Sequence, residues 1–186
     1  MIAKPEDLLE SEVSVSINNK NYTGRVGETI LDVAKRNNID IPHLCFKDGM
    51  RPDGNCRACV VEIEGERTLQ PSCVRTISEG MKIQTSNKKV VHSQKLVLEL
   101  LGSDISDKTY NSDSELDFWS KNLGISESRF PSKIQDKHDS THPAISVNLD
   151  ACIQCTRCVR ACREEQVNDV IGYANSCLLY TSPSPR

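Results

Sequence analysis

The sequence is poor in aromatic residues, which make up 4% of its 186 residues, so large aromatic side chains contribute little to a hydrophobic core. It also has no excess of positive charge, because its formal net charge is −3 at pH 7, and this argues against a nucleic-acid partner. Its apolar runs, such as Leu96–Leu98, are far shorter than the roughly 20 residues that span a bilayer. We therefore expect a protein that is not membrane-spanning, and whose small core needs additional cross-links.

The first residues, Met1–Asp7, lack the apolar segment of a signal peptide and are acidic where such a peptide is basic. Cysteines that stay in the reducing cytoplasm serve as metal ligands more often than as disulfides. The chain has nine cysteines, and eight of them fall into two tight groups. The sequence therefore predicts a cytoplasmic protein with metal centres at both groups.

The first group has the spacing C-x10-C-x2-C-x13-C and consists of Cys45, Cys56, Cys59 and Cys73. Glycines and a proline interrupt the stretch between the first two thiols, which indicates a loop. Four cysteine thiolates can hold a [2Fe–2S] cluster, and glycines let backbone N–H groups approach its sulfides. The pattern predicts an electron relay with these four residues as ligands.

The segments around this group predict an α+β fold. A helix is expected over residues 29–37, with Thr29 as its N-cap and Asp32 at its third position. Alternating apolar residues and flanking turns predict strands at residues 13–17, 22–26, 60–63, 68–70 and 82–85. The order ββαββ, with the cysteine loop after the helix and a final short strand, resembles a β-grasp [2Fe–2S] ferredoxin domain, expected over residues 12–89.

A further helix is expected over residues 90–102, ending at Gly102 and packing across the end of the β-grasp domain. Its apolar stripe consists of Val90, Val91, Val97, Leu98 and Leu101. The next segment, residues 103–141, is rich in Ser, Asp and Asn and is predicted to be a polar linker.

One short helix is expected within the linker. Leu116, Trp119 and Leu123 recur at helical spacing, and Ser114 precedes them as a plausible N-cap. Such a helix either docks on a partner or packs on the local core, and the sequence leaves both alternatives open.

The second cysteine group is Cys152, Cys155, Cys158 and Cys162, spaced C-x2-C-x2-C-x3-C within residues 142–175. This is the run of bacterial-type 4Fe-4S ferredoxins, in which the first three thiols bind one [4Fe–4S] cluster and the fourth ligates the other cluster of a pair. No second run is present in the sequence. Either the chain is a fragment with a truncated ferredoxin module, as we expect, or the four cysteines close one cluster in an unusual way.

Two details qualify this second module. The ferredoxin pattern has proline after its fourth cysteine, where this sequence has Arg163. Residues 177–186 resemble the translation of a sequencing-adapter read-through, so we expect a non-native tail and no ligand role for Cys177.

Both cysteine spacings, in this order, resemble the N-terminal part of the large subunit of NAD-linked, molybdenum-dependent formate dehydrogenases, over about residues 13–175. The large iron–sulfur subunit of respiratory complex I and the diaphorase subunits of NAD-reducing hydrogenases share the first pattern. Complex I subunits usually add a His-x3-Cys-x2-Cys-x5-Cys group between the two motifs, and no cysteine lies between Cys73 and Cys152 here. This difference favours the formate dehydrogenase branch.

The resemblance implies that formate is oxidised at a molybdopterin centre in a C-terminal portion missing here. It also implies that electrons leave through the iron–sulfur clusters to a flavin- and NAD-binding, diaphorase-type partner subunit. The alternative is an electron-carrier or diaphorase-type subunit of a hydrogenase or a complex I-like oxidoreductase. The sequence shows no Ser/His/Asp set, phosphate-binding glycine loop or carboxylate pair, so no catalytic residue is expected within it.

Zinc is the chemical alternative to iron–sulfur, because sites of four cysteines also bind zinc. Structural zinc sites favour paired C-x2-C knuckles, whereas Cys45 and Cys73 are isolated. We therefore expect iron–sulfur clusters at both groups.

Other candidate residues have two interpretations each. Arg57, Arg157 and Arg160 lie between cysteines of the two groups, so they either offset the negative charge of the clusters or are ordinary exposed arginines. His43 is either a donor or ligand near Cys45 or, as we expect, a residue at the solvent edge, and His92 is expected at the surface. His138 and His142 lack the nearby cysteines that would make them cluster ligands.

Overall fold

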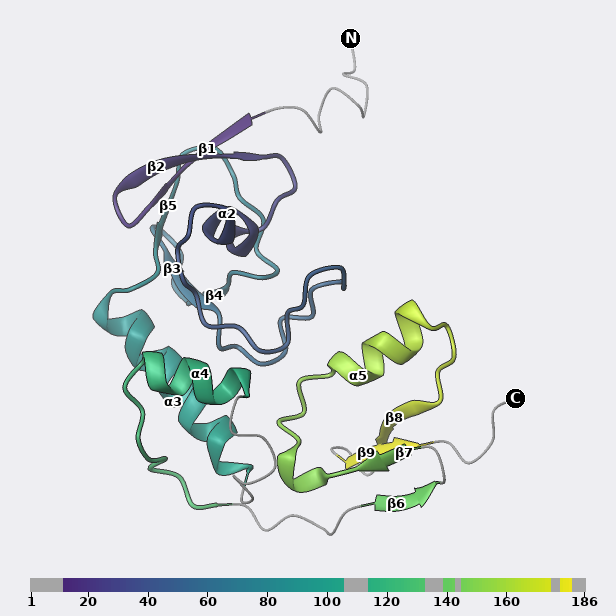
Figure 1. The fold of residues 1–186 in the computed structure, drawn as a ribbon. Coiled ribbons are helices and arrows are strands. Elements are labelled where there is room, and N and C mark those ends of the chain that lie inside the picture. The colour runs from purple at the N-terminus through teal and green to yellow at the C-terminus, as the bar shows by residue number, and fades with distance from the viewer. Residues whose placement is uncertain (1–11, 106–113, 133–138, 143–144, 175–177, 182–186) are drawn as a thin grey trace. The chain divides into compact units, whose positions relative to one another are not determined.

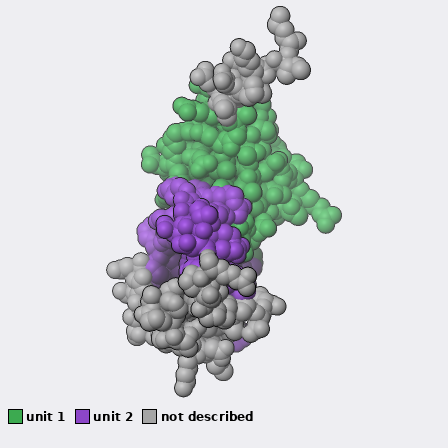
Figure 2. All heavy atoms as spheres, turned by 90° about the vertical axis from the view of Figure 1, so that its right-hand side faces the viewer, with its two compact units in different colours: residues 1–43, 52–95 green, residues 44–51, 96–186 purple. Residues whose placement is uncertain are grey.

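A computed structural model describes residues 12–105, 114–132, 139–142, 145–174 and 178–181 of the chain (Figure 1). The chain forms two compact units, which Figure 2 colours separately. The first unit contains Met1–His43 and Pro52–Lys95, and the second contains Leu44–Arg51 and Leu96–Arg186. The predicted boundary near residue 89 thus lies close to the division, but the loop around Cys45 groups with the second unit. None of the described helices has the length and apolar character that a bilayer crossing requires.

The first unit is built on a five-stranded mixed sheet of order β2-β1-β5-β3-β4, in which only β1 and β5 run parallel. Each predicted strand is present, within two residues of its predicted bounds. The shift at β4 concerns a short edge strand that includes Pro71, which has no N–H to donate and is therefore suited to an edge. The strands are β1 (Glu12–Ile17), β2 (Lys20–Arg25), β3 (Val60–Ile63), β4 (Gln70–Pro71) and β5 (Met81–Gln84).

Helix α2 (Ile30–Arg36) covers this sheet (Figure 1). The predicted N-cap is confirmed: the backbone N–H of Asp32 donates to Thr29 Oγ1 at 3.2 Å, and the N–H of Thr29 donates to Asp32 Oδ2 at 3.1 Å. This capping box satisfies two N–H groups that have no partner within the helix. The helix buries Ile30, Leu31, Val33 and Ala34.

Helix α3 (Lys88–Ser103) is longer than predicted, and Gly102 does not end it. Of the predicted apolar stripe, only Val90 and Leu98 are buried, and the buried face also contains polar residues. Gln94 is buried because its Nε2 donates to the carbonyl of Val60 at 3.0 Å. Glu99 is buried because its carboxylate accepts two hydrogen bonds from Arg129. A prediction from apolar spacing alone could not find these partners, because they come from distant segments.

The short helix predicted in the linker is α4 (Glu115–Asn122), and its N-cap is Ser114, whose hydroxyl accepts from the N–H of Asp117 at 3.1 Å. Leu116 and Trp119 are buried within the chain. Their burial favours the second alternative, a helix that packs on the local core.

In its described residues, the rest of the second unit contains two strand pairs, a 3-10 helical turn, a π-helical turn and a short α-helix. Strand β8 pairs with β9 in a register from Ile171 opposite Thr181 to Ala174 opposite Leu178. Part of the segment predicted to be a non-native tail therefore forms a strand. Cys177 lies outside the described residues. The elements are β6 (Asp139–His142), β7 (Ile145–Val147), η1 (Leu149–Ala151), α5 (Arg157–Arg160), η2 (Ala161–Glu165), β8 (Ile171–Ala174) and β9 (Leu178–Thr181).

The capping box predicts a measurable contribution to stability. Replacing Thr29 with Ala removes the cap oxygen and should lower the free energy of unfolding by about 1 kcal/mol. Thr76 is the matched control, because it lies opposite Thr29 in an isolated β-bridge and is exposed. Urea unfolding of both variants measures the difference; equal losses for Thr29→Ala and Thr76→Ala would contradict the assigned role of the cap.

Candidate iron–sulfur site

Two of the predicted [2Fe–2S] ligands are brought together by the pairing of β3 with β4. Val60 lies opposite Pro71, and one step further along the same ladder the N–H of Ser72 donates to the carbonyl of Cys59 at 3.0 Å. Cys73 follows directly. Cys59 and Cys73 therefore lie on neighbouring backbone segments at one end of the sheet.

The N-terminus of α2 fixes the segment that carries Cys73. The N–H of Leu31 donates to the carbonyl of Ser72, and the N–H of Ile30 donates to the carbonyl of Arg75, each at 3.0 Å. The first N–H groups of a helix have no intrahelical acceptor, so they are available to bind another segment. Helix α2 thus positions a cysteine that lies about 40 residues further along the chain.

The loop that carries Cys56 packs against the residue after Cys73. Gly54 has a φ of +64°, and a Cβ placed on it would lie 2.9 Å from Cγ2 of Val74. Arg57, between Cys56 and Cys59, also has a positive φ, of 59°. Left-handed residues turn successive backbone N–H groups toward one side, a concave arrangement that recurs at iron–sulfur sites. The segments bearing Cys56, Cys59 and Cys73 therefore converge within the first unit.

All four cysteines of the first group are buried and none forms a disulfide. Cys45 and Cys73 are fully buried. Beside Cys73, the hydroxyl of Ser72 is buried and has no hydrogen-bond partner among the described residues. A buried hydroxyl without a partner is costly, and a cluster sulfur bound at Cys73 is an acceptor to which it could donate. The donor set therefore fits a [2Fe–2S] cluster.

Within the described part of the chain, no three His, Cys, Asp or Glu side chains are grouped as ligands of one metal ion. A [2Fe–2S] cluster does not require such a group, because its four cysteines are divided between two irons. The assignment of the four ligands stays a prediction from the sequence.

The second cysteine group lies in a loop that leads into α5. Gln154 and Thr156, the residues on either side of Cys155, have positive φ values of 54° and 65°. Cys162 is buried in the π-helical turn η2, a type of irregularity that is frequent at functional sites.

The first three thiols of this group lie close enough to affect one another. Cys158 is exposed to solvent on one side, yet desolvation by the atoms around it, followed by the neighbouring Cys155 and Cys152, raises its pKa. Burial and the same three thiols, Cys152, Cys158 and Cys155, raise the pKa of Tyr173 to about 12. Cys152, Cys155, Cys158 and Tyr173 therefore lie in one neighbourhood, although the described thiols are not grouped as ligands of one metal ion. No pattern in the sequence identifies Tyr173.

The arginines predicted near the ligands differ in burial. Arg57 is exposed, which agrees with the interpretation as an ordinary surface arginine. Arg160, in contrast, is only 5% exposed. Arg157 is partly buried, and its Nε atom is buried with no hydrogen-bond partner among the described residues. An N–H without a partner, placed between Cys155 and Cys158, fits a site that binds an anionic cluster.

The structure describes the surroundings of His43 and His92. His43 is half-buried, and its Nδ1 donates to the carbonyl of Ile41 at 2.8 Å. His92 is exposed on α3, as predicted. His142 lies in β6, and His138 falls outside the described residues.

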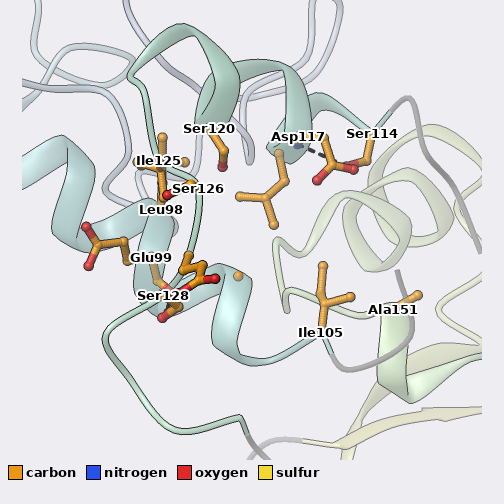
Figure 3. Close-up of a pocket in the computed structure, with 13 residues that line it drawn as sticks. Leu98, Glu99, Ile105, Ser114, Asp117, Ser120, Ile125, Ser126, Ser128 and Ala151 are labelled. Atoms are coloured by element: carbon orange, nitrogen blue, oxygen red, sulfur yellow. Dashed lines mark hydrogen bonds between the residues drawn. The ribbon is translucent and has the colours of Figure 1, made fainter. Parts of the chain in front are cut away.

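A cavity of about 270 Å³ lies in the second unit, beside α4 and the C-terminal half of α3 (Figure 3). Its described lining offers hydroxyls, carboxylates and aliphatic side chains but no thiol or imidazole. Figure 3 shows the hydroxyl of Ser114 bound to the carboxylate of Asp117, at 2.7 Å. This lining lacks the ligands that iron–sulfur clusters use, in agreement with the cysteine-free linker.

The contact between Gly54 and Val74 predicts a specific destabilisation. Replacing Gly54 with Ala adds left-handed strain of about 1–2 kcal/mol and a close contact worth about 1–3 kcal/mol. Gly65→Ala is the control, since Gly65 has a φ of +87° but no atom within 4 Å of its added Cβ. Denaturant unfolding should show a larger loss for Gly54→Ala, and losses of equal size would overturn the packing argument.

Comparison with known proteins agrees with this site. Residues 10–88 match the family model described as "2Fe-2S iron-sulfur cluster binding domain". An NADH-quinone oxidoreductase subunit of Rhizobium meliloti (strain 1021) is 34% identical over 161 residues, which is 82% of this chain and 19% of that protein. The NADP-reducing hydrogenase subunit HndD of Solidesulfovibrio fructosivorans is 33% identical over 175 residues, 89% of this chain and 30% of that protein.

A formate dehydrogenase candidate, YrhE of Bacillus subtilis (strain 168), is 28% identical over 86% of this chain and 17% of that protein. A solved structure of an NAD⁺-reducing [NiFe]-hydrogenase in the H2-reduced state matches 94% of this chain and 77% of its own chain, with a TM-score of 0.81 and 25% identity. The chain thus spans less than a third of the length of these three curated relatives. The comparisons identify a 2Fe-2S iron–sulfur cluster-binding domain over residues 10–88, in a chain related to NADH-quinone oxidoreductase and hydrogenase subunits and to formate dehydrogenases.

Proposed function

We propose that this chain is an iron–sulfur electron-transfer segment of an NAD(P)-linked oxidoreductase, with Cys45, Cys56, Cys59 and Cys73 as ligands of a [2Fe–2S] cluster. The observation that carries the proposal is the convergence of three cysteine-bearing segments in a domain that matches the 2Fe-2S family model. A [2Fe–2S] cluster supplies one-electron transfer when bound, and the chain supplies thiolates, burial and hydrogen-bond donors.

The second group extends the proposal to a [4Fe–4S] cluster. Cys152, Cys155 and Cys158 are assigned as three ligands of one cluster, and Cys162 as a ligand of the other cluster of a pair. The spacing of the four cysteines supports this assignment, together with the left-handed residues Gln154 and Thr156 between the first three thiols. Completion of both clusters requires a second cysteine run, which we place in a longer form of the protein.

The parent enzyme is proposed to be a formate dehydrogenase, with its molybdopterin centre in a C-terminal portion and a flavin- and NAD-binding subunit as its electron acceptor. The cysteine-free stretch between Cys73 and Cys152 favours this branch. A second candidate, a subunit of a hydrogenase or an NADH-quinone oxidoreductase, is favoured by its higher sequence identity, 33–34% against 28%.

The coding sequence downstream separates the two candidates. A formate dehydrogenase should continue into a second C-x2-C-x2-C-x3-C run and then a molybdopterin domain. A reading frame that ends shortly after the second ferredoxin half would contradict the formate dehydrogenase proposal and support the electron-carrier alternative.

The [2Fe–2S] proposal predicts the spectrum of the chain itself. After anaerobic reconstitution with iron and sulfide, the reduced protein should show the EPR signal of a [2Fe–2S] cluster. Cys73→Ser should lose this signal, because it removes a fully buried thiol ligand. Cys177→Ser makes the same chemical change at a cysteine with no assigned role and should keep it. A colourless protein that binds zinc instead would refute the electron-transfer function.

A further inference from the structure

The loop that carries Cys45 is bound by arginines of the second cysteine group, all within the second unit. Arg160, on α5 between Cys158 and Cys162, donates from Nη2 to the carbonyl of Cys45 and from Nη1 to the carbonyl of Arg51. Arg157 donates from Nη2 to the carbonyl of Phe46 at 2.5 Å. Two guanidinium groups therefore hold both ends and the interior of a loop more than 100 residues away in sequence.

The burial of Arg160 shows that this contact is part of the fold rather than a surface contact. Its side chain is 5% exposed, and its Nε donates to the hydroxyl of Thr156 at 3.2 Å. Arginine is almost never this buried unless its charge is matched. Its Nη1 and Nη2 each donate to a backbone carbonyl of that loop, and such hydrogen bonds help to stabilise a buried charge.

A third contact, an ion pair, also joins this loop to the segment of the second cysteine group but contributes little stability. The guanidinium of Arg51, at the end of the loop, pairs with Glu164 in η2 at 2.9 Å. The Arg51 side chain is 65% exposed, and exposed ion pairs contribute little to stability. The contacts of the buried Arg160 and the partly buried Arg157 are therefore the ones expected to position the loop.

We infer that Arg160, assisted by Arg157, is a positioning residue for Cys45. It fixes the backbone of the first predicted [2Fe–2S] ligand on the helix of the second cysteine group, and it holds a positive charge against that ligand. This inference rests on the proposed function. Hydrogen bonds and net charge around a cluster set its reduction potential, and a nearby positive charge stabilises the reduced, more negative form. Arg160 thus raises the potential of the [2Fe–2S] cluster.

The positioning role is tested in the cluster-free protein, so that it does not depend on cluster assembly. The full chain, with reduced thiols, is treated with iodoacetamide, and the alkylation of Cys45 and Cys73 is followed by peptide mass spectrometry. Both thiols are fully buried, which makes Cys73 in the first unit an internal reference. Arg160→Gln should increase the alkylation rate of Cys45 by about tenfold relative to Cys73, because local opening exposes it.

Arg163→Gln is the matched control. It removes the same charge from the neighbouring turn η2, but Arg163 is exposed and pairs with Asp169 at 2.7 Å. It should leave the ratio of the two rates unchanged. A Cys45 rate that Arg160→Gln does not change would overturn the inference. If Arg160→Gln accelerates both thiols equally, the fold is lost and Arg157→Gln decides: a selective rise at Cys45 supports the inference, and no selective rise overturns it.

The charge role is tested by an EPR-monitored redox titration of the reconstituted chain. Arg160→Gln should lower the midpoint potential of the [2Fe–2S] cluster by about 59 mV, a tenfold change for a one-electron couple. Arg160→Lys keeps the charge and should recover part of the shift, and Arg163→Gln should cause less. An unchanged potential in Arg160→Gln would overturn the charge role. Failure of the wild-type chain to bind any [2Fe–2S] cluster would instead refute the proposed function, and the alkylation result would still stand.

Discussion

The backbone of one buried residue, Ser72, connects the elements that shape the first cysteine site. Its N–H donates to the carbonyl of Cys59 at the start of β3, and its carbonyl accepts from the N–H of Leu31 at the start of α2. Sheet and helix therefore meet at the residue before Cys73. The N-terminus of a helix and the end of a strand both leave backbone N–H and C=O groups without hydrogen-bond partners. The backbone of Ser72 supplies a partner to each of them, so neither group is left buried and unpaired.

The two cysteine groups share two structural features that suit the binding of an anionic cluster. Each places a non-glycine residue in the left-handed region directly after a cysteine, Arg57 in the first group and Thr156 in the second. Each also leaves a buried donor without a described partner, the hydroxyl of Ser72 and Nε of Arg157. Such donors and turned N–H groups are costly in an empty fold and favourable beside an anionic cluster. In the proposed function the protein therefore contributes an electrostatic environment, and the electron chemistry belongs to the clusters.

The arginines of α5 bind the loop of Cys45 within the second unit. The loop of Cys45 belongs in sequence to the first group, but its carbonyls are bound by side chains of the second. An electron-transfer segment needs its ligands held in fixed positions, and hydrogen bonds from a rigid helix to a loop serve that need better than a free loop does.

Much of the local structure of the first domain follows from the order of its residues alone. The capping residues Thr29 and Ser114 and the strand β3 depend on propensities and spacing within a few residues, and the structure has them as predicted. The spacing of the cysteines likewise indicated the type of cluster, because ligand chemistry restricts which residues can serve.

The contacts between distant segments became visible only once the chain was folded. The polar face of α3 depends on Val60 and Arg129, the placement of Tyr173 depends on how β8 folds back toward the thiols, and the burial of Arg160 depends on a loop 115 residues earlier. An arginine between two ligands has the same sequence signature whether it is exposed, like Arg57, or buried, like Arg160. Burial is a property of the surroundings that the fold brings to a residue, and no local pattern encodes it.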